Sequence, residues 1–270
     1  KKNVDAKTNK IDSAIARVTK PKVESNESQK LEWGVSVSAG PSIIKDKFLL
    51  AGIGKKANLS AYSPGVYGGS GTPGAAFNTQ LGNQSSFAFK AGVVIKRTIS
   101  KRSSLSTGLT YAYLTDKIHI GFKQSNNSLL AGLMSISTYY GGTGQTTFID
   151  RFHFIELPLL FNWRLTADPR HFLSLDAGIS VSYLVSTNAL VYDTTGFGIY
   201  YHKNDQFAKG NISLLTGLSY HMVKKGFEWN IGPQFSFQLN KIIKSDFDER
   251  KYFLYTGIEG TIFFGKKKNK

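Results

Sequence analysis

Nine charged side chains occur in segments where apolar residues alternate with small or polar ones. In each segment the charged residues take the positions of the small and polar residues. The acids are Glu32, Asp116, Glu156, Asp176, Glu228 and Glu259, and the bases are Lys90, Lys96 and Arg164. Converging carboxylates can perform acid–base catalysis. Opposite charges in a poorly hydrated space must instead pair with one another. We favour an ion-paired structural network, in which Glu156 and Arg164 join Lys90 or Lys96, and we predict no catalytic residue.

The histidines do not form a recognisable metal or catalytic motif. They stand at positions 119, 153, 171, 202 and 221, without His-Glu-x-x-His or His-x-His spacing, and the chain has no cysteine. Zinc sites need such ligand sets. Three histidines border long loops, but no Ser or Asp constellation accompanies them, and His221 is expected to be a hydrogen-bonded inward residue. The sequence therefore predicts no metal, no cofactor and no enzyme.

A glycine-rich stretch superficially resembles a phosphate-binding loop. Gly68-Gly-Ser-Gly-Thr-Pro-Gly lacks the Gly-Lys-Ser/Thr ending of that motif and does not lead from a strand into a helix. We interpret it as a loop tip.

The elements that position these side chains are strands, because large apolar residues alternate with small or polar ones. In segment 227–240, Phe227, Trp229 and Ile231 interleave with Glu228 and Asn230. Successive side chains of a strand point to opposite faces, so such a segment has one apolar and one polar face. Eight segments share the pattern: 31–43, 86–98, 103–116, 152–166, 172–186, 210–223, 227–240 and 252–264.

The polar face of these segments is expected to point inward and the apolar face into lipid. No run of about 18–20 apolar residues provides a transmembrane helix, whereas segments of this length and alternation suit a membrane barrel. We predict an all-β fold, an antiparallel up-and-down transmembrane β-barrel of eight strands, and leave ten strands open. The aromatic residues expected to face lipid are Trp33, Phe87, Phe89, Phe161, Trp163, Phe227, Trp229, Phe235, Phe237 and Phe264.

Seven of the eight segments carry a glycine on the inward face. Glycine weakens a strand, so its recurrence needs a physical reason. Inside a narrow eight-stranded barrel, glycines are expected to relieve crowding at bends. The seven are Gly40, Gly92, Gly108, Gly178, Gly217, Gly232 and Gly257.

The connections alternate between short and long. Tight turns are expected at 100–102, 167–170 and 224–226; longer connections are 44–85, 117–151, 187–209 and 241–251. Outer-membrane barrels have short periplasmic turns and long extracellular loops, so both termini would be periplasmic. Alternating stretches at 133–140 and 198–202 predict hairpins beyond the bilayer. Tyrosines near the outer rim, at 139, 140, 200, 201, 252 and 255, are interpreted mainly as interfacial anchors.

The net charge of +16 would by itself suggest nucleic acid. However, many Lys and Arg residues lie in the first 30 residues, the C-terminal tail and the turns, and no compact basic face with stacking aromatics is evident. We therefore expect lipid headgroups or phosphate-rich polymer as neighbours and no nucleic acid. We divide the chain into a flexible basic tail or linker (1–30), a barrel (31–265) and a basic tail (266–270). Because a barrel needs export, we expect the chain to be a mature or trimmed form.

The fourth segment contains Phe154-Ile-Glu-Leu-Pro-Leu-Leu-Phe. With the strand pattern, this string resembles the small outer-membrane β-barrel proteins of Bacteroidota, a porin-family grouping that includes PorT-like proteins and is similar in architecture to OmpA- and OmpX-type barrels. The resemblance covers about 31–264. It implies the outer membrane of a Gram-negative bacterium. One departure is that Phe264 is followed by six mostly basic residues, whereas such chains usually end in an aromatic assembly signal.

These observations predict a non-enzymatic envelope barrel with a structural or protein-interaction role and a lumen plugged by polar and charged side chains. Its expected partners are outer-membrane lipid and lipopolysaccharide, with other envelope proteins or peptidoglycan contacting the N-terminal tail. One alternative is a PorT-like accessory factor in secretion or envelope assembly, which rests on the resemblance. The other is a soluble lipocalin-type ligand-binding barrel, whose apolar side chains would face inward.

Overall fold

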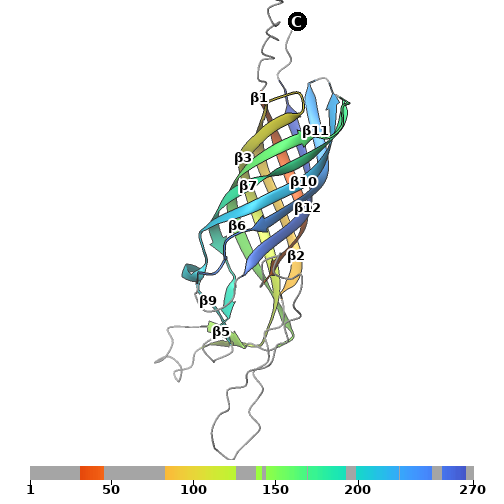
Figure 1. Cartoon of the computed structure of the whole chain (residues 1–270). Helices are drawn as coiled ribbons and strands as arrows, with labels where there is room; N and C mark the ends of the chain where they lie inside the picture. Colours follow the sequence, from red (N-terminus) through yellow and green to blue (C-terminus); the bar gives the residue numbers. More distant parts are fainter. Residues whose placement is uncertain are drawn as a thin grey trace, which may run out of the picture.

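Eight long antiparallel strands close into a barrel (Figure 1). The computed structural model describes residues 31–45, 83–125, 138–141, 144–168, 170–192, 199–224, 226–244 and 251–265. The barrel strands are β1 (Leu31–Lys45), β2 (Gln84–Thr98), β3 (Ser103–Ile120), β6 (Thr146–Arg164), β7 (His171–Thr187), β10 (Gly210–Lys224), β11 (Phe227–Gln238) and β12 (Tyr252–Phe264). The predicted fold class and the count of eight are confirmed.

Each barrel strand pairs with the barrel strands before and after it in the chain, and β12 closes the circle against β1. At that closure Trp33 pairs with Phe264, and Ser38 pairs with Glu259. Closure leaves no sheet edge with unpaired backbone groups. Among the described residues, no helix is long and apolar enough to cross a membrane.

The two ends of the barrel differ in their connections. At one end, which we call the turn end, short connections join β2 to β3, β6 to β7 and β10 to β11, and β1 begins beside the end of β12. The β10–β11 turn contains Gly226 with φ 97°, a conformation that favours glycine. The opposite end, which we call the loop end, carries the longer connections (Figure 1).

A small second sheet is formed by the connections at the loop end. Its order is β4-β5-β9-β8, with bounds Lys123–Ser125, Thr138–Gly141, Ile199–His202 and Leu190–Tyr192. Pairing of β4 with β5 and of β8 with β9 agrees with the expected hairpins, although residues 133–137 lie outside the described residues. The structure adds pairing between the two connections, in which Tyr140 of β5 lies opposite Tyr200 of β9.

The outer surface of the barrel carries a belt of exposed apolar side chains. Trp33 is 57% exposed and Phe87 is 61% exposed, although both belong to strands that are fully paired. Large exposed apolar surface of this kind marks contact with lipid or another apolar partner. All ten aromatic residues expected on this face lie there; Phe89, Trp229 and Phe237 are partly covered and the other seven are exposed.

The inward glycines mark close approaches between neighbouring strands. A Cβ atom at Gly178 would meet the carbonyl oxygen of Leu159, and one at Gly232 would meet that of Leu218. Both obstacles are backbone atoms of the adjacent strand. The expectation of crowding by lumen side chains is therefore corrected for these two positions, because the strand-to-strand approach sets the limit.

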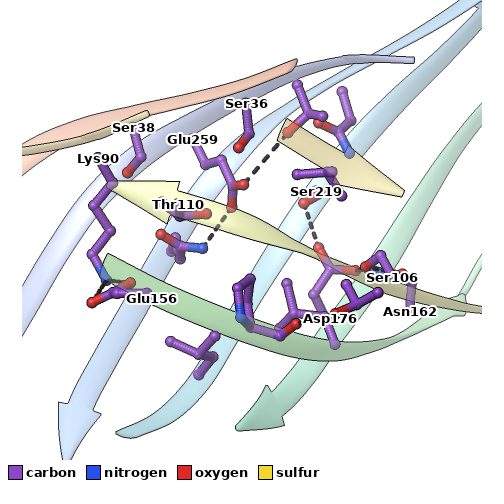
Figure 2. A pocket seen from close by; sticks show the side chains of 18 of the residues that line it. Ser36, Ser38, Lys90, Ser106, Thr110, Glu156, Asn162, Asp176, Ser219 and Glu259 are labelled. Atoms are coloured by element: carbon purple, nitrogen blue, oxygen red, sulfur yellow. Dashed lines mark hydrogen bonds and ion pairs between the residues drawn. The ribbon is translucent and has the colours of Figure 1, made fainter. Parts of the chain in front are cut away.

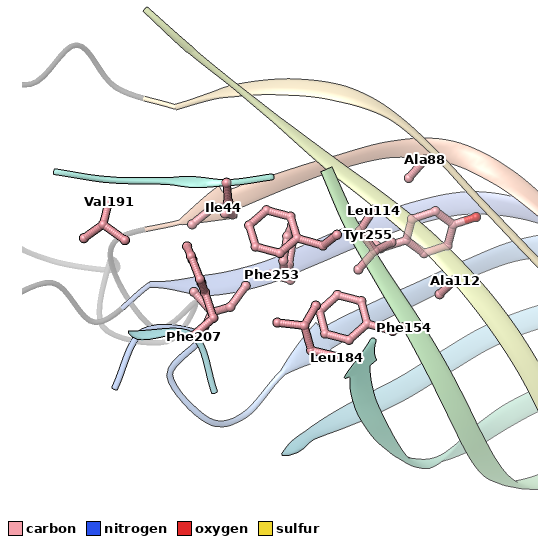
Figure 3. Close-up of a cluster of buried hydrophobic side chains, with 13 residues drawn as sticks. Ile44, Ala88, Ala112, Leu114, Phe154, Leu184, Val191, Phe207, Phe253 and Tyr255 are labelled. Carbon is pink, nitrogen blue, oxygen red and sulfur yellow. The ribbon is translucent and has the colours of Figure 1, made fainter. Parts of the chain in front are cut away.

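Inside the loop end, the barrel contains an apolar core (Figure 3). Phe154, Phe253 and Tyr255 extend inward from the wall, and Phe207 lies beside them from a connection. Ile242, also from a connection, belongs to the same cluster. The interpretation of Tyr255 as an interfacial anchor is wrong, because its side chain is 1% exposed and packs within this core. The complete cluster is Ile44, Ala88, Ala112, Leu114, Phe152, Phe154, Leu184, Ala189, Val191, Phe207, Ile242, Phe253 and Tyr255.

Candidate functional site

Below the apolar core, a buried ion pair on the inner face of the wall joins β2 to β6 across the intervening strand β3. Lys90 of β2 places its Nζ atom 3.0 Å from Oε2 of Glu156 on β6, and both side chains are buried (Figure 2). The same ammonium group lies 4.9 Å from the centre of the Tyr255 ring. A buried charge is tolerated when it is paired in this way. Of the alternatives that the sequence left open for Glu156, the structure brings together Glu156 and Lys90.

Arg164 does not join this pair. It lies eight positions beyond Glu156 on β6, so about 26 Å of strand separates the two residues. Its guanidinium group instead lies 3.9 Å from the centre of the Phe172 ring, close to the turn end. The expectation that Glu156 and Arg164 share one network is corrected, because residues on the same strand face occupy different levels of the lumen.

Asp176 is held by neutral donors. Its Oδ1 atom accepts hydrogen bonds from Asn162 Nδ2 at 2.8 Å and from Ser174 Oγ at 2.9 Å. Its Oδ2 atom accepts one from Ser219 Oγ at 2.5 Å. These donors come from β6, β7 and β10, so the carboxylate ties together three adjacent strands (Figure 2).

Glu259 lies opposite this cluster and borders a small cavity. Gln234 Nε2 donates to its Oε2 atom at 2.7 Å, and Thr261 Oγ1 donates to its Oε1 atom at 3.4 Å. The cavity has a volume of about 60 Å³ and is also lined by Lys90, Glu156 and Asp176 (Figure 2). A polar cavity of this size has room for a few water molecules.

Nearer the turn end, Glu228 accepts two charge-assisted contacts. Lys96 Nζ lies 2.7 Å from its Oε1 atom, and Nδ1 of His221 lies 2.7 Å from the same oxygen. Glu32 of β1 lies opposite Lys96 of β2 in the strand register, and both border the same cavity. The sequence therefore identified the charged members of this cluster, and the expected hydrogen-bonded His221 is found there.

Ser174 completes an arrangement that superficially resembles an acyl-transfer triad. Its Oγ atom lies 2.8 Å from Nε2 of His221, whose other nitrogen contacts Glu228. In a triad the serine hydroxyl must give its proton to that histidine nitrogen. Here the hydroxyl also lies 2.9 Å from Oδ1 of Asp176, which competes for the same proton, and Ser174 is 1% exposed. The geometry therefore describes a structural hydrogen-bond chain better than an activated nucleophile.

A larger cavity opens at the turn end. Its volume is about 470 Å³. Charged and hydroxyl-bearing side chains dominate its lining, which is Glu32, Lys96, Thr98, Ser100, Lys101, Arg102, Ser103, Ser104, Asn162, Arg164, Phe172, Ser174, His221, Val223 and Glu228. The sequence places Asn162 and Ser174 on the inward face by their even spacing from Arg164 and Asp176, but these two residues and Phe172 were not among the predicted site residues.

At the loop end, two acids face each other across β3 and β6. Asp116 pairs with Asp150, and both are buried. Exposed Arg151 follows Asp150 on the outer surface, which places this level beyond the apolar belt. The pKa of Asp150 is raised to about 8, chiefly by burial and also by the nearby Asp116, while the Leu190 N–H and Lys251 oppose the shift. Asp116 accepts a hydrogen bond from the backbone N–H of Ile44.

The remaining histidines are dispersed and bonded locally. His153 contacts the Tyr111 hydroxyl at 2.6 Å, His171 contacts that of Tyr220 at 3.0 Å, and His202 contacts the Ala189 carbonyl at 3.1 Å. In the part of the chain that the structure describes, no group of three His, Cys, Asp or Glu side chains could hold a metal ion.

Comparison with known proteins gives a family and a distant structural likeness. A family model for "Outer membrane protein beta-barrel domain" matches residues 28–244. Among solved structures, the chain is similar to the crystal structure of Ail, the attachment invasion locus protein of Yersinia pestis, in complex with the heparin analogue sucrose octasulfate. The two are 10% identical over 87% of this chain and 99% of that chain, with a TM-score of 0.31. No curated protein sequence matches this chain.

Proposed function

This chain belongs to the family of outer-membrane β-barrel proteins, and from that premise we propose that it is a non-enzymatic barrel with a structural or protein-interaction role in the cell envelope. In this proposal the wall sits in the outer membrane and the lumen does not conduct. The loops and the ends of the chain are then the parts available to partners. We assign no catalytic step to the interior, because Ser174 is buried and Asp176 competes with His221 for its hydroxyl proton.

The observation that carries the proposal is the complementary filling of the interior. Phe253 and Phe154 occupy the loop end, and the Lys90–Glu156 pair lies below them. An eight-stranded barrel is just wide enough for side chains to fill its interior. This filling of the described interior supports our proposal that the lumen lacks the continuous water-filled path that a general diffusion pore requires.

The soluble lipocalin-type alternative is rejected. Such a barrel needs apolar side chains inside along its length and polar ones outside. Here Trp33, Phe87 and Ile258 are exposed on the outer face, while Ser36, Ser38 and Lys90 are buried inside. An outer-membrane barrel has this orientation.

We place the turn end in the periplasm and the loop end outside the cell. Short periplasmic turns and long outer loops are the usual arrangement of these barrels. In this orientation the tail 1–30 would lie in the periplasm, where we propose that it contacts peptidoglycan or another envelope protein. Lipid and lipopolysaccharide would surround the apolar belt.

Conductance of proteoliposomes tests the closed-lumen proposal. The full chain, reconstituted in planar bilayers or vesicles, is expected to give no steady conductance above that of protein-free lipid. An open porin reconstituted in the same lipid serves as the positive control. A steady large conductance would show that the aromatic and charged side chains do not close the interior.

The periplasmic contact is tested by removing residues 1–30. Crosslinking in intact cells, followed by identification of attached proteins and glycan, is expected to lose its periplasmic products with the deletion. Recovery of the same partners from the deleted form would exclude the tail as the contact.

A PorT-like accessory role in secretion or envelope assembly is the second candidate. The string from Ile155 to Leu160 favours it, and that string lies in β6 with Glu156 bound to Lys90. Deletion of the gene should then change the set of proteins secreted into the medium. An unchanged secreted set would remove this candidate and leave the structural role.

A further inference from the structure

One cation of the lumen stands apart from the others. Lys90 is paired with Glu156, and Lys96 is paired with Glu228. Within the described residues, the guanidinium group of Arg164 has neither an ion pair nor a hydrogen bond, and it packs on the face of Phe172. Because Arg164 is partly buried, an unpaired charge there is unfavourable unless an anion or water completes its contacts.

A stack of three planar groups fixes the position of this guanidinium. It lies 3.9 Å from the centre of the Phe172 ring. Phe172 in turn stacks on His221, with ring centres 4.4 Å apart and planes at 10°. His221 is fixed in turn by contacts at both ring nitrogens, from Nδ1 to Glu228 and from Nε2 to Ser174. Stacking occupies the face of a guanidinium but leaves the N–H groups of its edge free to bind two oxygens of an anion.

The surroundings of Arg164 provide space and further donors. Its side chain borders the turn-end cavity of about 470 Å³, a volume within the usual range of small-molecule sites. Lys101 and Arg102 lie at the same cavity, as do hydroxyls of Ser103 and Ser104. The carboxylates that border it are already engaged, because Glu228 binds Lys96 and His221, and Glu32 has a partner of its own.

We propose that the turn-end cavity binds a small polar ligand, or an end group of a polymer, through a carboxylate or phosphate that Arg164 grips with two N–H groups. Bidentate binding of these planar or tetrahedral oxyanions is the characteristic use of arginine. The serine hydroxyls would contact the uncharged polar parts of the ligand. The binding site is inferred from the contacts of Arg164 and the cavity alone. Only its access from the periplasm rests on the proposed function.

Three probes separate the sources of the anion. N-acetylmuramic acid carries a carboxylate, N-acetylglucosamine is its neutral counterpart, and inorganic phosphate represents phosphate ligands. The full chain in detergent at low ionic strength is titrated with each by calorimetry. Binding of the acidic sugar alone assigns a carboxylate ligand, binding of phosphate alone assigns a phosphate ligand, and binding of both assigns the shared chemistry. Absence of binding by both anions, or equal binding of the neutral sugar, would overturn the proposal.

Variants then test the assigned residue. Arg164→Gln should weaken anion binding by at least about tenfold, since it removes a charge-assisted contact. Arg164→Lys keeps the charge but loses the two-pronged grip, so it should give an intermediate loss. Arg151→Gln, at the exposed loop-end part of the same strand, should bind as the unmodified chain does. Equal affinity of the Arg164→Gln and Arg151→Gln variants would overturn the assignment.

The folded state of each variant is checked by its electrophoretic mobility with and without boiling. If Arg164→Gln does not fold, Phe172→Leu serves as the second variant, because it removes the stacking surface and keeps the charge; affinity unchanged in Phe172→Leu would count against the site. A folded barrel that fails to bind contradicts this inference alone. An unmodified chain that forms no barrel contradicts the proposed function instead.

Discussion

At the loop end the barrel interior is packed with aromatic and aliphatic side chains, whereas at the turn end it holds charges, hydroxyls and a cavity of about 470 Å³. A single strand makes both environments. Along β6, the inward side of the wall carries Phe152 and Phe154, then Glu156, and finally Asn162 and Arg164. Strand alternation therefore decides which side chains face inward, and the position along the strand decides which of the two interiors they join.

The difference also separates two kinds of stabilisation. The loop-end core excludes water and gains from burial of apolar surface. The middle level depends on the buried Lys90–Glu156 pair, and loss of either partner leaves the other charge uncompensated. Removal of one side chain should therefore have different consequences at the two levels.

The largest effect is expected at the loop-end core. Phe152→Ala should lower the free energy of unfolding by about 3–5 kcal/mol, because the wall around a fully buried ring cannot collapse into the space. Guanidinium unfolding in lipid vesicles measures the change. Phe87→Ala, on the exposed outer face, is the control and should cost clearly less. Similar losses for the two variants would contradict a packed core inside the barrel.

The ion pair in the middle of the lumen is expected to give the next effect. Glu156→Gln leaves the Lys90 ammonium buried without its counter-charge, which costs about 3 kcal/mol, the lower end for such pairs, because the adjacent cavity admits water. The melting temperature should decrease accordingly. Adding Lys90→Met should recover much of the loss, and strictly additive effects of the two changes would argue against a direct pair.

An added methyl group should destabilise the barrel wall where two neighbouring strands approach closely. Gly178→Ala should destabilise the barrel by about 1–3 kcal/mol, since the new Cβ atom meets the Leu159 carbonyl oxygen. Gly210→Ala is the matched control, because nothing lies within 4 Å of its Cβ position. The two unfolding free energies are compared under the same conditions, and equal values would refute the close approach.

A pH-dependent effect is expected at the loop end. Burial raises the pKa of Asp150 from 3.8 to about 8, so the folded loop end is most stable below about pH 4 and loses stability as the pH rises toward 8. Local opening should become about tenfold more favourable per pH unit in this window. Asp150→Asn keeps an acceptor for the Leu190 N–H and should abolish the dependence. Hydrogen exchange of the Leu190 amide, followed as a function of pH, measures this local opening. The same pH profile in the variant and the unmodified chain would contradict the assignment of the effect to Asp150.

The strands of the barrel wall could be predicted from the sequence, because the alternation of apolar and polar residues is a local property. The segment 86–98, for example, was predicted two residues short of β2, which covers Gln84–Thr98. The pairing of charges was not predictable in the same way. Lys90 meets Glu156 because of the stagger between β2, β3 and β6, and one sequence does not reveal that stagger.

The loop-end core was missed for a related reason. Tyr255 stands near the end of a strand, where tyrosine commonly anchors at the membrane interface. Its inward direction followed from alternation, but the covering residues Phe207 and Ile242 belong to connections without a strand pattern. These two residues complete a buried cluster whose other members come mainly from the barrel strands.

The orientation of the wall is tested most directly with the chain's own tryptophans. All three, Trp33, Trp163 and Trp229, lie on the outward face near the turn end. In vesicles made from brominated lipids, their fluorescence should be quenched strongly, and more by bromine near the headgroups than by bromine at the chain ends. Fluorescence that brominated lipid leaves unchanged, with efficient quenching by a water-soluble quencher, would contradict the account.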